Sequence, residues 1–427
     1  MKASRVSLEP TEEQTHAEFV SRCGTAYSVA RFARPRVMHL SFHLIAGVAC
    51  LSLLIWIVLT FFRGGFWQLR ALDGDARIGE QMQKWPRVVA VVPARNEADT
   101  IARCVGSLVD QDYPGDFQII VVDDHSDDGT AALARDGLPS GGKQERVLLL
   151  RAAELQPGWT GKLWALQEGT TPAASFSPDY FWFTDADIVH APDTLRRLVA
   201  RAENQHLDLV SLMVLLQAKT IPERLLIPPF LYFFLKLYPP NWIADANSKT
   251  AGAAGGCILL RKEALARIGG ISAIRAEVID DCALARAVKR SGGNIWMGLT
   301  RKSMSLRAYK HSGEIRDLIA RTAFTQLGYS AVLLLGTVAG MLLTYVMPVL
   351  LSFDSQPLIW RSSLAAWALM TLTYLPTVRF YRLSPLWALL LPFAALFYSY
   401  ATCISAARYW LGRGGQWKGR AQAQARP

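Results

Sequence analysis

Short apolar runs alternate with amphipathic helical patterns between residues 87 and 215. The first run is rich in valine and is ended by Pro93, which is typical of a buried strand. The alternation of such runs with helical spacing predicts an α/β fold with a mostly parallel sheet and crossover helices. Strands are expected at 87–92, 117–122, 180–184 and 208–215, and helices at 97–111 and 192–202.

Longer apolar runs flank this region and contain no charged residue. The first, 42–62, is long enough to cross a bilayer, and the Arg63 and Phe66-Trp67 that follow it are typical of a membrane interface. Three more runs lie near the C-terminus, the second of them short and the third containing two prolines. We expect two to three spans there. The C-terminal runs are 330–353, 362–378 and 383–407.

Basic residues create a conflict over how the C-terminal runs cross the membrane. Arg379 and Arg382 lie between the last two runs, and the tail from 408 onward is basic. Basic segments favour the cytoplasmic side. If the sheet domain is cytosolic and all three C-terminal runs cross, the tail lies outside. We therefore expect that one of these runs does not cross fully.

The composition narrows the function classes. The chain has 427 residues, a net charge of +11 and 51% hydrophobic residues. The basic residues flank the apolar runs, which indicates a membrane rather than a nucleic acid as the partner. The six cysteines are scattered without a C-x-x-C pair, which argues against a zinc site or a disulfide framework. The apolar runs carry no charge that would line a transport pathway.

Two carboxylates follow the apolar residues 180–183 at a spacing of two. On an extended backbone, Asp185 and Asp187 point to the same side. Such a pair suits a hard cation, Mg²⁺ or Mn²⁺, which shares oxygen ligands with a substrate diphosphate. The alternative is an Asx-rich turn after a strand. The site interpretation places a metal–diphosphate centre at the carboxyl end of the strand.

Polar residues also follow the two preceding strands. Asp123 and Asp124 end the 117–122 run, where carboxylates are able to accept hydrogen bonds from a nucleoside. The motif Pro-Ala-Arg-Asn-Glu at 93–97 follows the first strand, either as a ligand contact or as a capped helix start. Lys162 lies after a glycine-containing turn, where it either reaches a diphosphate or is solvated.

Two adjacent acids, Asp280 and Asp281, begin a helix expected from 279 onward. The helix dipole and capping explain one of them. Adjacent carboxylates also raise each other's pKa, which suits a general base that takes a proton from an acceptor hydroxyl. Cys282 is expected in the core. The apolar stretch 225–238 is broken by two prolines and is expected to lie in the membrane interface.

The ordered set of these motifs resembles the membrane-bound, inverting family 2 glycosyltransferases with a type A nucleotide-sugar fold, over about residues 87–298. Several motifs are similar to those of the hopanoid-biosynthesis-associated glycosyltransferases. These are Gly-Trp-Thr-Gly-Lys-Leu-Trp-Ala at 158–165, Thr-Asp-Ala-Asp-Ile at 184–188, Ser-Leu-Met at 211–213, Ala-Gly-Gly-Cys at 254–257, Ile-Asp-Asp-Cys-Ala-Leu-Ala at 279–285, Arg-Gly-Gly-Phe-Trp at 63–67 and Arg-Thr-Ala-Phe-Thr-Gln-Leu at 321–327.

The resemblance implies a role for each matched residue. The nucleotide-sugar contacts are Pro93, Ala94, Arg95, Glu97, Asp123, Asp124, Lys162 and Asp185. Asp185 and Asp187 engage the metal and the diphosphate, Gly255 and Gly256 lie on the acceptor side, and Asp281 is the base, with Asp280 replacing the family's usual glutamate. The Gln-x-x-Arg-Trp motif of processive synthases is absent, so transfer of a single sugar is expected.

These inferences combine into one expected organisation. The segments are a polar extension (1–41), a transmembrane helix (42–62), a linker (63–85), a cytosolic transferase domain (86–310), an interfacial linker helix (311–329), a membrane region (330–407) and a basic tail (408–427). The expected protein is a multi-pass inner-membrane enzyme that glycosylates a lipid, in hopanoid biosynthesis. The alternatives are another lipid acceptor, such as ceramide, a carotenoid or a polyprenyl phosphate, and a non-catalytic membrane scaffold.

Overall fold

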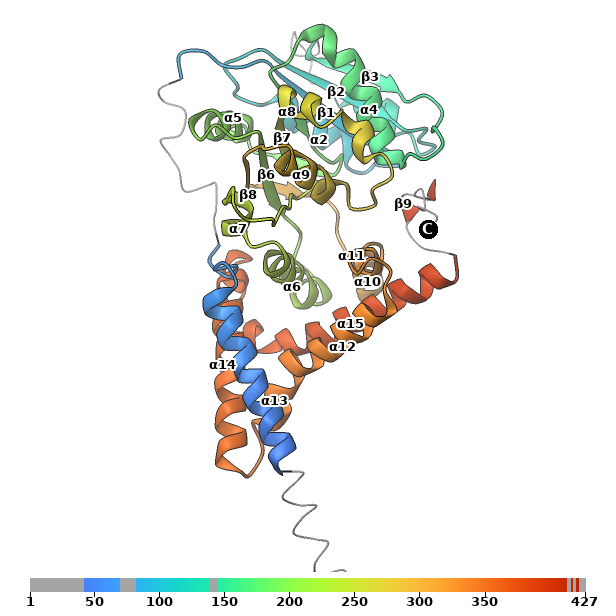
Figure 1. The fold of residues 1–427 in the computed structure, drawn as a ribbon. Helices are drawn as coiled ribbons and strands as arrows, with labels where there is room; N and C mark the ends of the chain where they lie inside the picture. Colours follow the sequence, from blue (N-terminus) through green and yellow to red (C-terminus); the bar gives the residue numbers. More distant parts are fainter. Residues whose placement is uncertain (1–41, 70–81, 138–144, 413–415, 418–419, 422–427) are drawn as a thin grey trace, which may run out of the picture.

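The computed structural model describes residues 42–69, 82–137, 145–412, 416–417 and 420–421. A layered α/β domain lies above a group of apolar helices, and helices α6, α10 and α11 lie between the two parts (Figure 1). The expected extension 1–41 and most of the expected basic tail lie outside the described residues. Part of the expected linker does so as well.

One eight-stranded sheet forms the centre of the upper domain, in the order β3-β2-β1-β4-β7-β6-β8-β5. Four neighbouring pairs are parallel, and three are antiparallel because β7 and β5 run against their neighbours. The strands are β1 (Val88–Ala94), β2 (Phe117–Asp123), β3 (Val147–Arg151), β4 (Tyr180–Phe183), β5 (Ile188–His190), β6 (Leu209–Leu215), β7 (Ile258–Arg261) and β8 (Ile295–Ser305).

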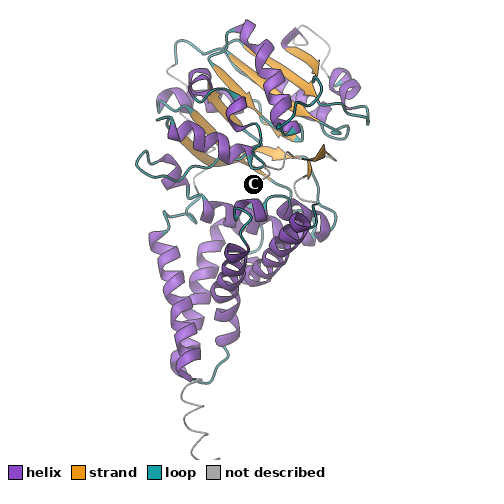
Figure 2. Cartoon of the chain, turned by 45° about the vertical axis from the view of Figure 1, so that its right-hand side comes forward, coloured by secondary structure: helices purple, strands orange, loops and turns teal. Residues whose placement is uncertain are grey.

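Helices cover both faces of the sheet (Figure 2). Apolar residues of α2 and α5 pack on one face, and those of α4, α8 and α9 pack on the other. Helix α4 lies so close to β1 that a Cβ on Gly169 would stand 2.4 Å from a methyl group of Val91. These helices are α2 (Ile101–Val109), α3 (Thr130–Asp136), α4 (Gly161–Ala173), α5 (Thr194–Asn204), α8 (Lys262–Arg267) and α9 (Asp280–Arg290).

Strands β1, β2, β4 and β6 and helices α2 and α5 agree with the sequence pattern except at their ends, whereas β3, β5 and β8 were not predicted. The first strand continues through Pro93, which pairs with Val122, because a proline at the end of a strand costs only one ladder hydrogen bond. Helix α2 is shorter than the expected 97–111 because Thr100 precedes its first residue. The antiparallel β7 was not expected, since the apolar pattern of a strand does not specify its neighbours.

Within the part of the chain that the structure describes, three helices are long and apolar enough to cross a membrane: Phe42–Phe62, Ala331–Leu351 and Pro385–Trp410. The second consists of α12, a π-helical segment and α13, and the third consists of a 3₁₀ helix and α15. The remaining elements below the sheet are α6 (Ile221–Leu237), α7 (Pro240–Ala244), α10 (Ser312–Ala320), α11 (Ala323–Gln326), α12 (Ala331–Met341), η4 (Leu342–Val346), α13 (Met347–Leu351), α14 (Pro357–Phe380), η5 (Pro385–Leu390) and α15 (Leu391–Trp410).

The π-helical segment η4 is held by helix Phe42–Phe62. Ser52 Oγ donates to the carbonyl of Leu343 at 3.0 Å, and Trp56 Nε1 donates to that of Thr344 at 2.7 Å. A π-helix changes the normal helical hydrogen-bond pattern, and these donors satisfy two of its carbonyl groups. The Trp56 ring also packs edge-on against Tyr345 at 5.4 Å. The two helices are thereby fixed against each other.

Candidate active site

The loop after β4 places Asp185 and Asp187 at the carboxyl end of the sheet. Its first residue, Thr184, is buried and donates to the carbonyl of Gly256 at 2.9 Å. The same hydroxyl accepts from Nε2 of His190 at 2.9 Å. Burial lowers the pKa of His190 to about 3, so the ring is neutral. Because Thr184 uses its only proton on Gly256, we assign the ring proton to Nε2.

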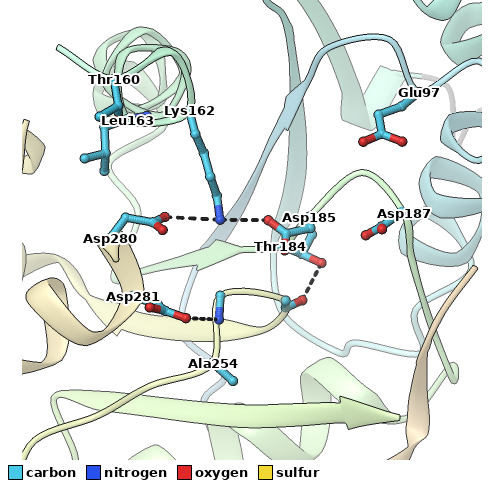
Figure 3. Close-up of polar contacts among 12 residues, drawn as sticks. Glu97, Thr160, Lys162, Leu163, Thr184, Asp185, Asp187, Ala254, Asp280 and Asp281 are labelled. Carbon is cyan, nitrogen blue, oxygen red and sulfur yellow. Dashed lines mark hydrogen bonds and ion pairs between the residues drawn. The ribbon is translucent and has the colours of Figure 1, made fainter. Parts of the chain in front are cut away.

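Lys162, in the first turn of α4, joins the β4 loop to α9. Its Nζ lies 2.9 Å from Asp185 Oδ1 and 3.1 Å from Asp280 Oδ2 (Figure 3). Burial alone lowers the pKa of this ammonium, but the two carboxylates outweigh burial and raise it above its usual range. Lys162 is therefore charged and bound to two acids, so it is not merely solvated.

Asp281 begins α9 together with Asp280, and its carboxylate faces the glycine loop before β7. Gly255 N–H donates to Oδ2 at 2.9 Å, and Cys282 N–H donates to Oδ1 at 2.7 Å. Burial, and then the charge of Asp280, raise the pKa of Asp281 to about 6. A carboxylate with this pKa is ionised near neutral pH and is basic enough to accept a proton in a transition state.

A third group of charges is formed by Asp187, Glu97 and Arg307. Arg307 Nε lies 3.1 Å from Asp187 Oδ2, and its Nη2 lies 3.1 Å from Glu97 Oε1. Burial lowers the pKa of Arg307, but Asp187 and Glu97 outweigh burial and raise it. Arg307 was not predicted from the sequence, because its contacts join segments that are distant along the chain.

These groups line one cavity of about 580 Å³. Asp185, Asp187, Asp280 and Asp281 lie at its sheet side, with Gly255 and Gly256. The cavity continues to α6 and α10, where side chains that the sequence analysis did not single out line it. They are Phe230, Phe234, Glu314, Asp317, Leu318 and Arg321. The site is thus polar at the sheet and partly aromatic next to the apolar helices.

Asp123 and Asp124 lie at the same end of the sheet but are not among the residues that line this cavity. The carboxylate of Asp124 is fully buried, 3.8 Å from Arg95 and 3.5 Å from His125. Asp123 accepts from the Ser126 N–H at 3.4 Å. These two predicted residues therefore lie outside the lining of the cavity, because their carboxylates face Arg95, His125 and Ser126.

The residues predicted at the end of the first strand lie partly at the cavity and partly against the β2 loop. Pro93 and Glu97 line the cavity, whereas Ala94 and Arg95 are not among its lining residues. The Ala94 carbonyl accepts from the Asp124 N–H at 2.8 Å, and the Arg95 guanidinium donates to the Asp124 carbonyl. The segment 93–97 therefore links the β2 loop to the cavity.

The donor set suits a hard divalent cation that also binds a substrate. Asp185 and Asp187 present carboxylate oxygens to the cavity, as Mg²⁺ and Mn²⁺ prefer. Among the described residues, no three His, Cys, Asp or Glu side chains form a metal cluster. Two carboxylates are enough where substrate phosphates supply further ligands. The residues present therefore fit an ion that binds together with a diphosphate.

Comparison with known proteins gives a family match that covers most of the sheet domain. Residues 89–269 match the family "Glycosyl transferase family 2". An N-acetylglucosaminyltransferase of Mesorhizobium japonicum is 30% identical over 134 residues, which are 31% of this chain and 29% of that protein. Glycosyltransferase AglE of Haloferax volcanii is 39% identical over 51 residues, 12% of this chain and 17% of that protein. The chain thus spans less than a third of either relative.

Solved structures resemble the chain at low identity. The mannosyltransferase PcManGT from Pyrobaculum calidifontis, solved with GDP-Man and Mn²⁺, has a TM-score of 0.49 and 17% identity, over 85% of this chain and 99% of that chain. Glucosyl-3-phosphoglycerate synthase from Mycobacterium tuberculosis, solved with Mn²⁺, UDP-glucose and phosphoglyceric acid, has a TM-score of 0.36 and 19% identity, over 57% of this chain and 80% of that chain.

The upper domain is a type A glycosyltransferase fold, with a mixed, mostly parallel sheet and acids at its carboxyl end. Residues 89–269, within this domain, are similar to the family 2 glycosyltransferases.

Proposed function

We propose that this protein is a membrane-anchored, inverting glycosyltransferase that moves one sugar from a nucleoside-diphosphate sugar to a hydroxyl group of a membrane lipid. The observation that supports the proposal most strongly is the single cavity, which joins Asp187 and Asp281 to the aromatic side chains of α6. A donor at the sheet end and a lipid at the helix end would meet at Asp281.

The proposed reaction is a single displacement. Asp281 takes the proton of the acceptor hydroxyl while the acceptor oxygen forms a bond to the anomeric carbon of the sugar. The bond from that carbon to the diphosphate oxygen breaks, and the nucleoside diphosphate leaves with the electron pair. Attack from the face opposite the leaving group inverts the anomeric configuration. The Gly255 and Cys282 amides hold the carboxylate in place for this proton transfer.

The cations of the cavity suit the donor side. Lys162 and Arg307 lie beside Asp185 and Asp187, where they are able to contact a diphosphate when it binds. Mg²⁺ or Mn²⁺ held by Asp185 and Asp187 would neutralise charge on the leaving diphosphate. Asp123, Asp124 and Arg95, at the adjoining sheet edge, are proposed as nucleoside contacts, as the family resemblance implies.

The charges at the helix end of the cavity favour an uncharged acceptor. Two carboxylates line that end, Glu314 and Asp317, against one cation, Arg321, so an acceptor with its own phosphate, such as a polyprenyl phosphate, would be repelled. Phe230, Phe234 and Leu318 suit an apolar lipid body. A hopanoid acceptor agrees with both features, and its identity rests on the resemblance of the motifs. We place the sheet domain in the cytoplasm at the inner membrane, the side that the basic residues favour.

The test is transfer by the purified full-length protein, using nucleoside-diphosphate sugars, membrane lipid extract and Mn²⁺ or Mg²⁺, with mass spectrometry of the lipids. We expect a lipid glycoside from the wild type and a loss on the order of 10²–10⁴-fold for Asp281→Asn. Asp136→Asn, an exposed carboxylate of α3, is the matched control and should retain the wild-type rate. Wild-type turnover by Asp187→Ala or Asp281→Asn would show that the roles are misassigned.

A further inference from the structure

The C-terminal helix is apolar enough to cross the membrane, yet both of its ends lie beside elements of the sheet domain. It follows α14, whose last carbonyls accept from Arg301 of β8. Arg301 Nε donates to Phe380 at 2.9 Å, and Nη2 donates to Arg379 at 3.1 Å. The start of η5, only a few residues later, is therefore close to the sheet domain.

The far end of α15 is held by α10 and α11, which lie between the sheet and the apolar helices. Arg408 Nη2 lies 2.6 Å from Asp317 Oδ1 in α10. Ser405 Oγ donates to the Ala320 carbonyl at 2.5 Å and accepts from the Phe324 N–H at 3.0 Å. In the middle of the helix, Tyr398 donates to the Leu226 carbonyl of α6 at 2.8 Å. Helix α15 therefore runs beneath α6, α10 and α11, which lie between it and the sheet domain (Figure 1).

Length makes this placement incompatible with a full crossing. The segment Pro385–Trp410 has 26 residues, or about 39 Å as a helix, which is more than the thickness of the hydrocarbon core. A crossing helix of this length would place its two ends on opposite sides of the membrane. Here both ends contact elements on one side.

Helix α14, unlike α15, has its two ends on opposite sides of the group of apolar helices. Its start packs near the N-terminal end of helix Phe42–Phe62, where Ala46 and Ala49 cluster with Ile359 and Leu351. Its end reaches β8. Helix Phe42–Phe62 has its other end at the sheet domain, since Arg63 donates to the Lys236 carbonyl of α6 at 3.0 Å. The helices Phe42–Phe62, Ala331–Leu351 and α14 therefore each have one end in the same region, on the side away from the sheet domain.

We propose that the chain crosses the bilayer three times, through Phe42–Phe62, Ala331–Leu351 and α14, and that η5 and α15 lie within the leaflet next to the sheet domain. The outer face of η5–α15 carries exposed apolar side chains at helical spacing, and its partner is the acyl-chain layer of that leaflet. This stripe continues the lipid-facing surface of the crossing helices. It consists of Leu386, Leu389, Phe393, Leu396 and Tyr400.

This topology removes the conflict among Arg379, Arg382 and the start of the basic tail, and leaves Arg361, near the start of α14, on the far side. Arg379 and Arg382, at the end of α14, and Arg408, at the end of α15, all lie on the side of the sheet domain. All of them then agree with the preference of basic residues for one side. In addition, α15 supports α10, which carries the cavity residues Asp317 and Leu318. A lipid-embedded helix therefore lies directly beneath the cavity.

The test is labelling of introduced cysteines by a membrane-impermeant maleimide in sealed vesicles with the sheet domain outward. The full-length background has Cys23, Cys50 and Cys403 replaced by serine and keeps the buried Cys104, Cys257 and Cys282, and its own labelling is subtracted from that of each variant. Lys310→Cys, exposed on the sheet-domain side, is the positive reference, and Ser355→Cys, exposed between α13 and α14, is the reference for the far side. We expect Ser384→Cys and Leu411→Cys to be labelled without detergent, and Ser355→Cys only after detergent is added.

Two results would overturn the proposal. Protection of Ser384→Cys would mean that α14 does not cross and that α15 does. Protection of Leu411→Cys would mean that α15 is a fourth crossing. If either variant fails to accumulate in membranes, Arg382→Cys and Trp410→Cys are exposed replacements with the same expected outcomes. Labelling does not depend on sugar transfer, so its result is independent of the proposed function.

Discussion

Replacing Asp280 with asparagine should move the pH dependence of sugar transfer to lower pH. Asp280 lies beside Asp281, and its charge is the second cause, after burial, of the raised pKa of Asp281. It also binds Lys162 at 3.1 Å. The substitution removes a repulsive charge and leaves Lys162 free to attract the remaining carboxylates. Both changes favour the ionised form of Asp281, so its pKa should fall.

The size of the shift follows from the structure. The pKa of Asp281 is about 6, against an ordinary value of 3.8, and burial, the larger cause, remains in the variant. We therefore expect a fall of about one pH unit, equivalent to about 1.4 kcal/mol. At about pH 5, roughly a tenth of the wild type but half of the variant would be ionised, so activity relative to the plateau should rise about fivefold.

The assay is the pH profile of kcat/KM between about pH 4.5 and 8, which reports the pKa values of the free enzyme. Each enzyme is normalised to its own plateau, so a lower absolute rate does not affect the comparison. Asp136→Asn, on the outer surface of α3, should keep the wild-type profile. An acid limb that stays in place, or moves to higher pH, would refute the assignment of that limb to Asp281.

Two other substitutions test the hydrogen bonds that hold the β4 loop and the lipid end of the cavity. Thr184→Val should lower the free energy of unfolding by about 2–4 kcal/mol, because it leaves the Gly256 carbonyl and the His190 ring without their buried partner. Thr184→Ser keeps the hydroxyl and should be as stable as the wild type; equal stability of the two variants in denaturant unfolding would contradict this. Phe234→Ala should raise KM for the lipid acceptor severalfold with little change in KM for the donor, since Phe234 lines the cavity at α6; an equal rise in both would show that Phe234 does not act on the acceptor alone.

Local patterns in the sequence predicted most of the sheet domain. The valine-rich run before Pro93 and the aromatic run before Asp185 are strands, as expected, because burial on both faces requires continuous apolar residues. The direction of β7 was not predictable in this way. Strand direction depends on which residues pair across the sheet, and no local pattern contains that information.

The site was predictable in part: several of its acids and Lys162 were expected, whereas Arg307 was not and Asp123 and Asp124 do not line the cavity. Asp185, Asp187 and Asp281 lie at strand or helix ends and line one cavity, as expected. The partners of Lys162 and the presence of Arg307 depend on contacts between distant segments, so the sequence alone could not show them. The crossing of α14 was similarly obscured, because polar residues lower its hydropathy, while its direction is fixed by Arg301 of β8.

The most direct test of the central claim separates donor binding from sugar transfer in Asp281→Asn. Donor affinity is measured by calorimetry with Mn²⁺ present, and transfer is measured in a single turnover with excess enzyme. If Asp281 is the base at a cavity that holds the donor through other residues, the variant should bind the donor with nearly wild-type affinity and transfer sugar on the order of 10²–10⁴ times more slowly. Transfer at the wild-type rate would contradict the claim.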